Sequence, residues 1–162
     1  MSHVRGEITI KRAVEEVFDF VADQRNEPRY NDAMLESEKL TEGPVGAGTS
    51  FRAIVGNSGR PVEMLIEFVE FDRPRFIRET THMAAMDIRG TLTFQPALEG
   101  TRMRWSWELV PHGVYRLMGP VLAQLGSRQE ARIWASLKDY LEQPGLTTAA
   151  SPDAVVSSEN AR

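Results

Sequence analysis

The stretch ITIKRAVEEVFDFVAD, residues 8–23, changes its apolar period in the middle. Ile8 and Ile10 extend an alternation that starts at Val4, which is typical of a strand with one buried face. From Val14 to Val21 the apolar residues recur at helical spacing, with acidic residues between them. A strand followed at once by a helix is therefore predicted.

The segment after this helix, Asp23 to Asp32, is polar apart from Tyr30. Pro28 discourages a continuous helix because proline lacks a backbone N–H and restricts the residue before it. A second, very short helix or a loop is predicted here.

From Leu35 onward, glycine and proline recur at short intervals between runs that suit strands. Tight turns separate these runs, as expected for antiparallel hairpins. The six predicted strands lie near Leu35 to Leu40, Thr49 to Val55, Val62 to Phe71, Phe76 to Thr81, Met86 to Gln95 and Arg102 to Val110.

The apolar period becomes helical again in the last part of the chain, and a helix is predicted from about Tyr115 to Glu142. Gly119 and Pro120 are expected to bend this helix or to delay its first turn. The pattern as a whole predicts an α+β protein with one strand, two short helices, six strands and a long C-terminal helix.

The chain of 162 residues suits one domain. Residues 146–162 carry no aromatic side chain and are predicted to form a disordered tail, because they bury too little apolar surface to offset ordering. The folded domain is expected to span residues 1–145.

A seven-stranded antiparallel sheet with one apolar face needs a cover, and the long helix is large enough to provide it. A strongly curved sheet around one helix leaves space between them. Large apolar residues alternate along three strands toward this space, either as the wall of a ligand site or as simple core packing. They are Val62, Met64, Ile66 and Phe68, then Met86, Ile88, Leu92 and Phe94, then Met103, Trp105, Trp107 and Leu109.

Composition excludes several classes of partner and cofactor. A formal net charge of -4 argues against nucleic acid, and the absence of cysteine excludes disulfides, iron–sulfur clusters and thiolate zinc sites. His3, His82 and His112 stand far apart without a metal-binding spacing, and no nucleophile elbow or phosphate loop occurs. We expect no metal and no cofactor.

The first residues lack the pattern of a signal peptide, and no apolar run approaches the ~20 residues of a membrane span. A cytoplasmic protein, without stable membrane insertion, is the expectation. The oligomeric state is expected to be a monomer or a homodimer.

Several segments together resemble the SRPBCC superfamily, and within it the polyketide cyclase/dehydrase and lipid-transport group, related to START and Bet v 1 proteins. They are residues 8–23, EGPVGAG at 42–48, EFDRPR at 70–75, and GTLTF at 90–94 followed by GTRMRW at 100–105. The resemblance implies a helix-grip fold, in which the sheet grips the C-terminal helix and the cavity between them takes a hydrophobic ligand. It also implies that the two short helices border the entrance, with Tyr30 where many members have a tryptophan.

The residues predicted to contact such a ligand are Tyr30, Phe51, Met64, Ile66, Phe68, Ile88, Leu92, Met103, Trp105, Trp107, Leu122 and Leu125. Two main functions fit them. The first is binding of a small lipid- or polyketide-like molecule by a carrier, sensor or sequestering protein.

The alternative is a polyketide cyclase, aromatase or dehydratase that works by acid/base-assisted enolisation. Tyr30, Arg78 and His82 would then be the acid/base candidates, with Trp105 stacking on the substrate. The resemblance implies an inward arginine on the strand 62–71 of such enzymes, and Phe68 stands near that position, which favours the binding protein. A protein-interaction role, carried by apolar residues near 114–118, is a third possibility.

Overall fold

The computed structural model describes residues 2–56 and 59–146, so the predicted tail beyond residue 146 lies outside the described residues. Within them the chain forms one antiparallel sheet and four helices. The elements are β1 (Ser2–Ile10), α1 (Val14–Ala22), the 3-10 helix η1 (Gln24–Arg29), β2 (Met34–Lys39), β3 (Ser50–Val55), β4 (Val62–Asp72), β5 (Phe76–His82), β6 (Met86–Ala97), β7 (Gly100–Pro111), the 3-10 helix η2 (Gly113–Met118) and α2 (Gly119–Leu141).

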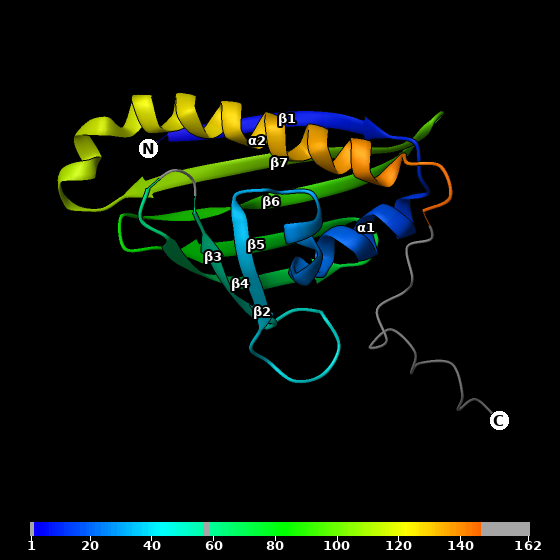
Figure 1. The fold of residues 1–162 in the computed structure, drawn as a ribbon, viewed down its shortest axis with the longest axis horizontal. Helices are drawn as coiled ribbons and strands as arrows, with labels where there is room; N and C mark the ends of the chain where they lie inside the picture. The colour runs from blue at the N-terminus through cyan, green and yellow to red at the C-terminus, as the bar shows by residue number, and fades with distance from the viewer. Residues whose placement is uncertain (1, 57–58, 147–162) are drawn as a thin grey trace.

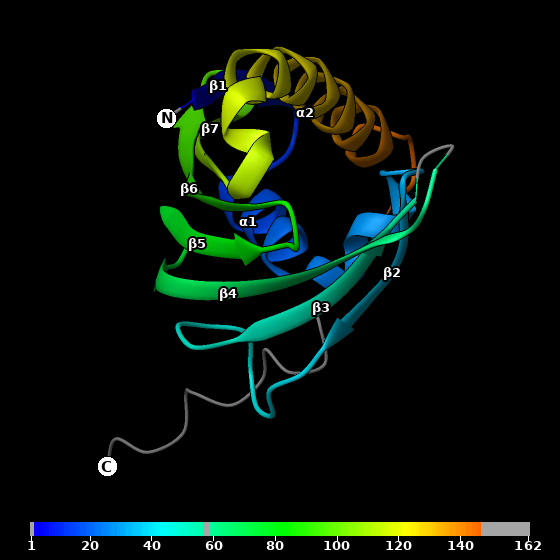
Figure 2. The same ribbon diagram turned by 90° about the vertical axis from the view of Figure 1, so that its left-hand side faces the viewer.

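The sheet has the strand order β1-β7-β6-β5-β4-β3-β2, and neighbouring strands are antiparallel. Figure 1 shows α2 lying along β1 and β7, with α1 near the end at which α2 finishes. Viewed from the side, the sheet curls from β1 round to β2 while α2 closes the open arc (Figure 2). The predicted helix-grip architecture is confirmed.

Local sequence explains the breaks between the helices. Pro28 lies inside η1, where the chain follows a short 3-10 helix in place of a longer α-helix, and the Asp23 side chain caps that helix by accepting a hydrogen bond from the Arg25 backbone N–H. Pro120 stands in the first turn of α2, a position that tolerates proline because the first backbone N–H groups of a helix lack partners. The predicted delay at Gly119 is confirmed by η2, which precedes α2.

Two tryptophans of β7 fit the sheet because glycine lies opposite each of them. Trp105 pairs with Gly6 on β1, and Trp107 pairs with Gly90 on β6. A Cβ atom at Gly6 would meet the Trp105 ring at 2.2 Å, and one at Gly90 would meet the Trp107 ring at 2.3 Å. The missing side chains therefore leave room for both indole rings on the inner face.

The core is densest where α1 packs on the sheet. Phe18 is fully buried and lies edge-to-face against Phe71 and Phe94, with ring centroids 5.2 and 5.0 Å apart. Phe51 and Phe68 continue the same cluster, 5.5 Å apart. Packed side chains fill this end of the interior.

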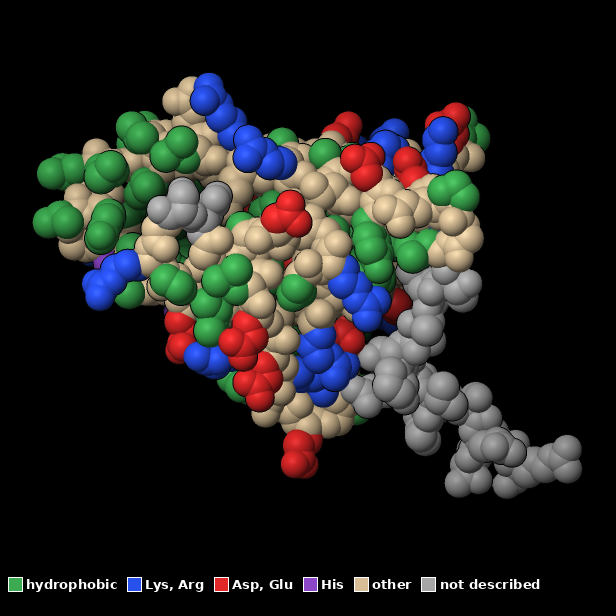
Figure 3. All heavy atoms as spheres, in the orientation of Figure 1, with side chains coloured by type: hydrophobic (Ala, Val, Ile, Leu, Met, Phe, Trp, Pro, Cys, Tyr) green, Lys and Arg blue, Asp and Glu red, His purple; other side chains and the backbone are tan. Residues whose placement is uncertain are grey.

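The opposite end carries exposed apolar side chains on η2 and the first turns of α2. Figure 3 shows them gathered at that end of the molecule, and the most exposed are Val114, Leu117, Val121 and Leu125. None of the helices among residues 2–56 and 59–146 is long and apolar enough to cross a membrane.

Candidate ligand-binding cavity

A cavity of about 440 Å³ lies between the sheet and the N-terminal half of α2. Its wall is largely apolar and comes from every strand and from α2, with η1 and Asn31 closing one side. Val62 and Leu125 line the cavity and are 40% and 57% exposed, so the cavity opens to solvent between the start of β4 and α2. Its size and apolar wall are typical of a small-molecule site.

Of the residues predicted to contact a ligand, seven line this cavity. They are Met64, Ile66, Ile88, Leu92, Trp107, Leu122 and Leu125. They come from β4, β6, β7 and α2, and the alternation along the strands placed the first five correctly on the inner face.

The other predicted contacts lie outside the cavity wall. Phe51, Phe68 and Met103 are fully buried in the packed end of the core, and Trp105 packs against Trp134 with ring centroids 5.9 Å apart. Alternation shows which side chains point inward, but the inner face is filled at one end and hollow at the other. The side chains of these four residues point inward, but they pack against other side chains and do not line the cavity.

Tyr30 is also packed and does not border the opening. Its ring lies 6.0 Å from the Phe20 ring and 6.4 Å from the Trp134 ring, and the residue is 8% exposed. Burial, followed by the nearby Glu27, Glu130 and Glu79 carboxyls, raises the pKa of Tyr30 well above its usual value. The residue is buried and does not line the cavity, in contrast to the rim position that the sequence suggested.

Arg78 and His82, the other acid/base candidates, lie on the outer face of β5. Arg78 pairs with the Glu70 carboxylate, and His82 contacts Asp87 at 3.0 Å and Glu67 at 3.5 Å. Both point away from the cavity because Ile77, one residue before Arg78, takes the inner face of the strand.

Glu79 takes the inner face instead and reaches the cavity. The residue is only 9% exposed, and its Oε2 atom has no hydrogen-bond partner. Burial, together with the Glu27 and Glu130 carboxyls, raises the pKa of Glu79 to about 8. Glu79 is therefore a mostly neutral carboxylic acid at pH 7.

Glu27 enters the cavity from η1. Its Oε1 atom accepts a hydrogen bond of 2.7 Å from the Asn31 side-chain amide. Burial, with a smaller contribution from the Glu130 carboxyl, raises the pKa of Glu27 to about 7, although the Asn31 bond acts in the opposite direction. This carboxyl titrates near neutrality.

Glu130 enters from α2. Its Oε2 atom accepts two hydrogen bonds, from the Trp107 indole N–H at 2.9 Å and from the Trp134 indole N–H at 2.8 Å. Burial raises the pKa of Glu130, and the two indole bonds offset part of that effect. The three glutamates thus converge on one cavity from η1, β5 and α2.

Sequence reasoning did not make these glutamates ligand-binding or acid/base candidates, although two of them carry a signal. Glu79 follows Ile77 by two residues and so shares its inner face. Glu130 precedes the buried Trp134 by four residues and Leu137 by seven, which places it on the buried stripe of α2. Glu27 lies in a short 3-10 helix whose sequence has no period to reveal its direction.

No group of three or more possible ligands for a metal ion is found in the described part of the chain.

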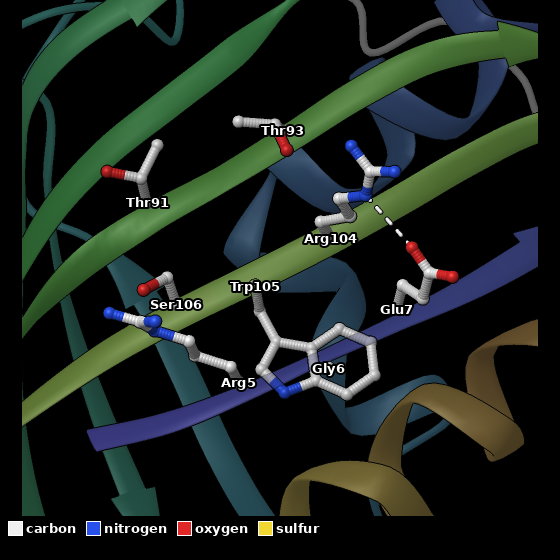
Figure 4. Close-up of a pocket in the computed structure, with 8 residues that line it drawn as sticks. All are labelled: Arg5, Gly6, Glu7, Thr91, Thr93, Arg104, Trp105 and Ser106. Carbon is white, nitrogen blue, oxygen red and sulfur yellow. Dashed lines mark hydrogen bonds and ion pairs between the residues drawn. The ribbon is translucent and has the colours of Figure 1, made fainter.

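A second pocket lies on the outer face of the sheet, over β1, β7 and β6 (Figure 4). Arg5, Thr91, Thr93 and Ser106 surround it, and Arg104 of β7 pairs with Glu7 of the neighbouring edge strand β1 at 2.9 Å. Most of the residues that line it are polar, which is typical of an outer sheet face.

The curled sheet, the gripped helix and the cavity between them define a helix-grip fold. The chain belongs to the family described as polyketide cyclase / dehydrase and lipid transport, whose model matches residues 1–142. A comparison with curated protein sequences gives no match.

Solved structures share the fold at low sequence identity. A START superfamily protein from Mycobacterium smegmatis has a TM-score of 0.75 at 12% identity, over 88% of this chain and 98% of that one. The Zhui aromatase/cyclase from a Streptomyces species has a TM-score of 0.74 at 15% identity, over 86% and 93%. The protein TTHA0849 from Thermus thermophilus has a TM-score of 0.73 at 22% identity, over 86% and 96%.

Proposed function

We propose that this protein binds a small hydrophobic molecule in the cavity between the sheet and α2, as a carrier, sensor or sequestering protein. The observation that carries the proposal is a cavity of about 440 Å³ with a largely apolar wall and an opening to solvent. Membership of a family that includes lipid transport supports it. Burial of ~300 Å² of apolar ligand surface at ~25 cal/mol/Å² stabilises a complex by about 7 kcal/mol before the costs of association.

Native mass spectrometry of the freshly purified protein, followed by organic extraction, tests this proposal. The expected result is a bound or readily accepted apolar compound of a mass that suits the cavity. The variant Ile88→Trp places an indole ring on the cavity wall, where it would occupy part of the space, and should abolish binding. Leu98→Trp, at a fully exposed turn position, is the matched control and should bind as the wild type does.

A well-folded protein that retains and accepts no apolar compound from a broad panel would contradict the proposal. Equal binding by Ile88→Trp and the wild type would place the ligand elsewhere. Circular dichroism of both variants separates loss of binding from loss of fold.

A second candidate function is acid/base catalysis of enolisation in the same cavity. The observation that favours it is the Glu79 carboxyl, since its raised pKa of about 8 keeps a proton available at neutral pH. Glu27, with a pKa of about 7, would act as the complementary base. These groups would take the roles that the sequence assigned to Tyr30, Arg78 and His82.

Deuterium exchange at the α-carbons of 2-decanone, followed by NMR, tests for this activity. An enzyme should exchange these protons faster than buffer alone does, and Glu79→Gln should lose the effect. Arg78→Gln on the outer face is the matched control and should keep it. Exchange no faster than in buffer would remove this candidate.

A further inference from the structure

The charged groups that line the cavity in the described part of the chain are all of one sign. Glu27, Glu79 and Glu130 reach it from three different elements, whereas no lysine, arginine or histidine of residues 2–56 and 59–146 lines it. Tyr30, packed behind Glu27, adds a phenol whose ionisation the same carboxyls disfavour. The wall therefore offers acceptors without a matching cation.

Hydrogen bonding is incomplete at the same place. Glu27 receives a bond from Asn31, and Glu130 receives two from indole N–H groups. Glu79 is nine-tenths buried, and its Oε2 atom receives none from the protein. Because buried polar atoms are nearly always hydrogen-bonded, this oxygen indicates a donor that the chain does not supply.

In the ligand-free protein, protons bound to the carboxyls reduce the negative charge of the cavity. Burial disfavours the charged form of each carboxyl, and repulsion from neighbouring carboxyls adds to this effect at Glu79 and Glu27. The result is a raised pKa for all three, with values of about 8 for Glu79 and about 7 for Glu27. A positive group in the cavity would release these protons and be held by the carboxylates.

A bound metal ion is a poor candidate for that positive group. The three carboxyls do not form a group able to hold a metal ion within the described residues. Most of the remaining wall is apolar, with side chains such as Met64, Ile88 and Leu122. The two parts of the wall together match a molecule with one positive end and an apolar body.

We propose that the ligand of this cavity is a hydrophobic amine, whose ammonium group donates hydrogen bonds to Glu79 and lies among Glu27 and Glu130. This inference rests on the proposed function, the binding of a hydrophobic molecule in the cavity. The carboxyls also select against fatty acids and other anions, because a ligand carboxylate would add negative charge beside partly ionised carboxyls that no basic side chain of the described residues compensates.

Isothermal titration calorimetry with three probes of equal chain length tests the proposal. The probes are decylamine, 1-decanol and decanoate, measured at pH 7.5. Decylamine should bind at least tenfold more tightly than 1-decanol, and decanoate should bind at least tenfold more weakly than 1-decanol. Decylamine stays protonated at this pH because an alkylammonium group has a pKa of ~10.4, as in lysine.

Proton release provides a readout that a merely apolar site would not give. Binding of decylamine should release part of a proton from Glu79 and Glu27, measured as a difference in binding enthalpy between phosphate and Tris buffers. The affinity for decylamine should rise from pH 6 to pH 8.5 as the carboxyls ionise, while that for 1-decanol should not change.

Glu79→Gln keeps the size of the side chain and removes its charge. It should reduce the affinity for decylamine to near that for 1-decanol and suppress most of the proton release. Glu63→Gln, on the exposed outer face of the neighbouring strand, is the matched control and should change neither.

The outcomes separate this inference from the function on which it rests. Equal affinity for the three probes, or tighter binding of decanoate, would overturn the amine proposal and leave hydrophobic binding intact. Failure of all three probes, 1-decanol included, would overturn both.

Discussion

The two ends of the interior are built from the same alternating strands but differ in what fills them. Near α1, the aromatic rings of Phe18, Phe71 and Phe94 pack at 5.0 to 5.2 Å. Under the N-terminal half of α2, the strands face a cavity of about 440 Å³ with three carboxyls on its wall. The packed end stabilises the fold, and the hollow end has room for the proposed ligand.

The difference follows from the helices that cover the sheet. α1 inserts Phe18 and Val17, both fully buried, into the space near the end of α2. At the other end η2 precedes α2, and both carry exposed apolar residues; among the described residues no second α-helix covers the sheet there. A pocket is therefore left where one helix alone covers a strongly curved sheet.

The comparison is tested most strongly by one pair of isoleucines. Ile77 is fully buried in the packed end, whereas Ile88 lines the cavity. Ile77→Ala should destabilise the protein by about 3 kcal/mol and Ile88→Ala by about 1 kcal/mol, because the wall residue already lacks neighbours on one side. Urea denaturation of the ligand-free protein measures both, and equal losses would mean that the cavity is filled by side chains in solution.

A second test uses the pH dependence of stability. The folded-state pKa values of Glu79 and Glu27, about 8 and about 7, lie above the ordinary value of 4.5. Between these values the folded state binds more protons than the unfolded state, so the free energy of unfolding falls as the pH rises.

We expect wild type to lose about 3 kcal/mol more than Glu79→Gln between pH 5.5 and pH 8.5, since each pH unit up to the folded-state pKa contributes about 1.4 kcal/mol per proton. Denaturation curves at several pH values measure the difference. Glu63→Gln is the control and should follow the wild type. Parallel curves for wild type and Glu79→Gln would show that Glu79 is solvated.

Two tryptophans on one strand sharpen the comparison further. The Trp107 indole donates to Glu130 at the cavity, whereas the Trp105 indole N–H is buried without a partner. Trp107→Phe should cost about 1.5 kcal/mol more than Trp105→Phe and raise the pKa of Glu130, because only the first change removes a hydrogen bond to a carboxylate. NMR titration of the Glu130 side chain and denaturation measure these effects, and identical behaviour of the two variants would contradict the assignment.

The smallest effects are expected on the outer face. Arg78→Gln and His82→Gln should each change the free energy of unfolding by less than about 0.5 kcal/mol, because they remove exposed ion pairs. Neither should alter the binding of 1-decanol. A loss of binding in either variant would mean that these residues act on the cavity from outside.

Much of the fold could be predicted because its signals are local. The alternation from Val4 to Ile10 and the helical spacing from Val14 to Val21 arise because each element buries one face. The structure confirms both elements. The break at Pro28 and the delayed start of α2 at Gly119 follow from backbone chemistry within a few residues.

The site was predicted less completely because it depends on which inward residues have neighbours. Phe68 and Met64 share one inner face of β4, yet Phe68 packs on Phe51 while Met64 faces the cavity. Arg78 and Glu79 are neighbours that face opposite sides of β5, and no local feature indicates that the Glu79 carboxyl would lack a hydrogen-bond partner.

The sequence by itself determined the elements, their order and the side of each strand that turns inward, because these follow from the period of neighbouring side chains. Only the tertiary structure decided that Glu27, Glu79 and Glu130 share one cavity, since they are up to 103 residues apart and meet through the curl of the sheet around α2. Burial raises the pKa of each, and repulsion between the carboxyls adds to it at Glu27 and Glu79; both effects act through space and cannot be read from the order of the residues.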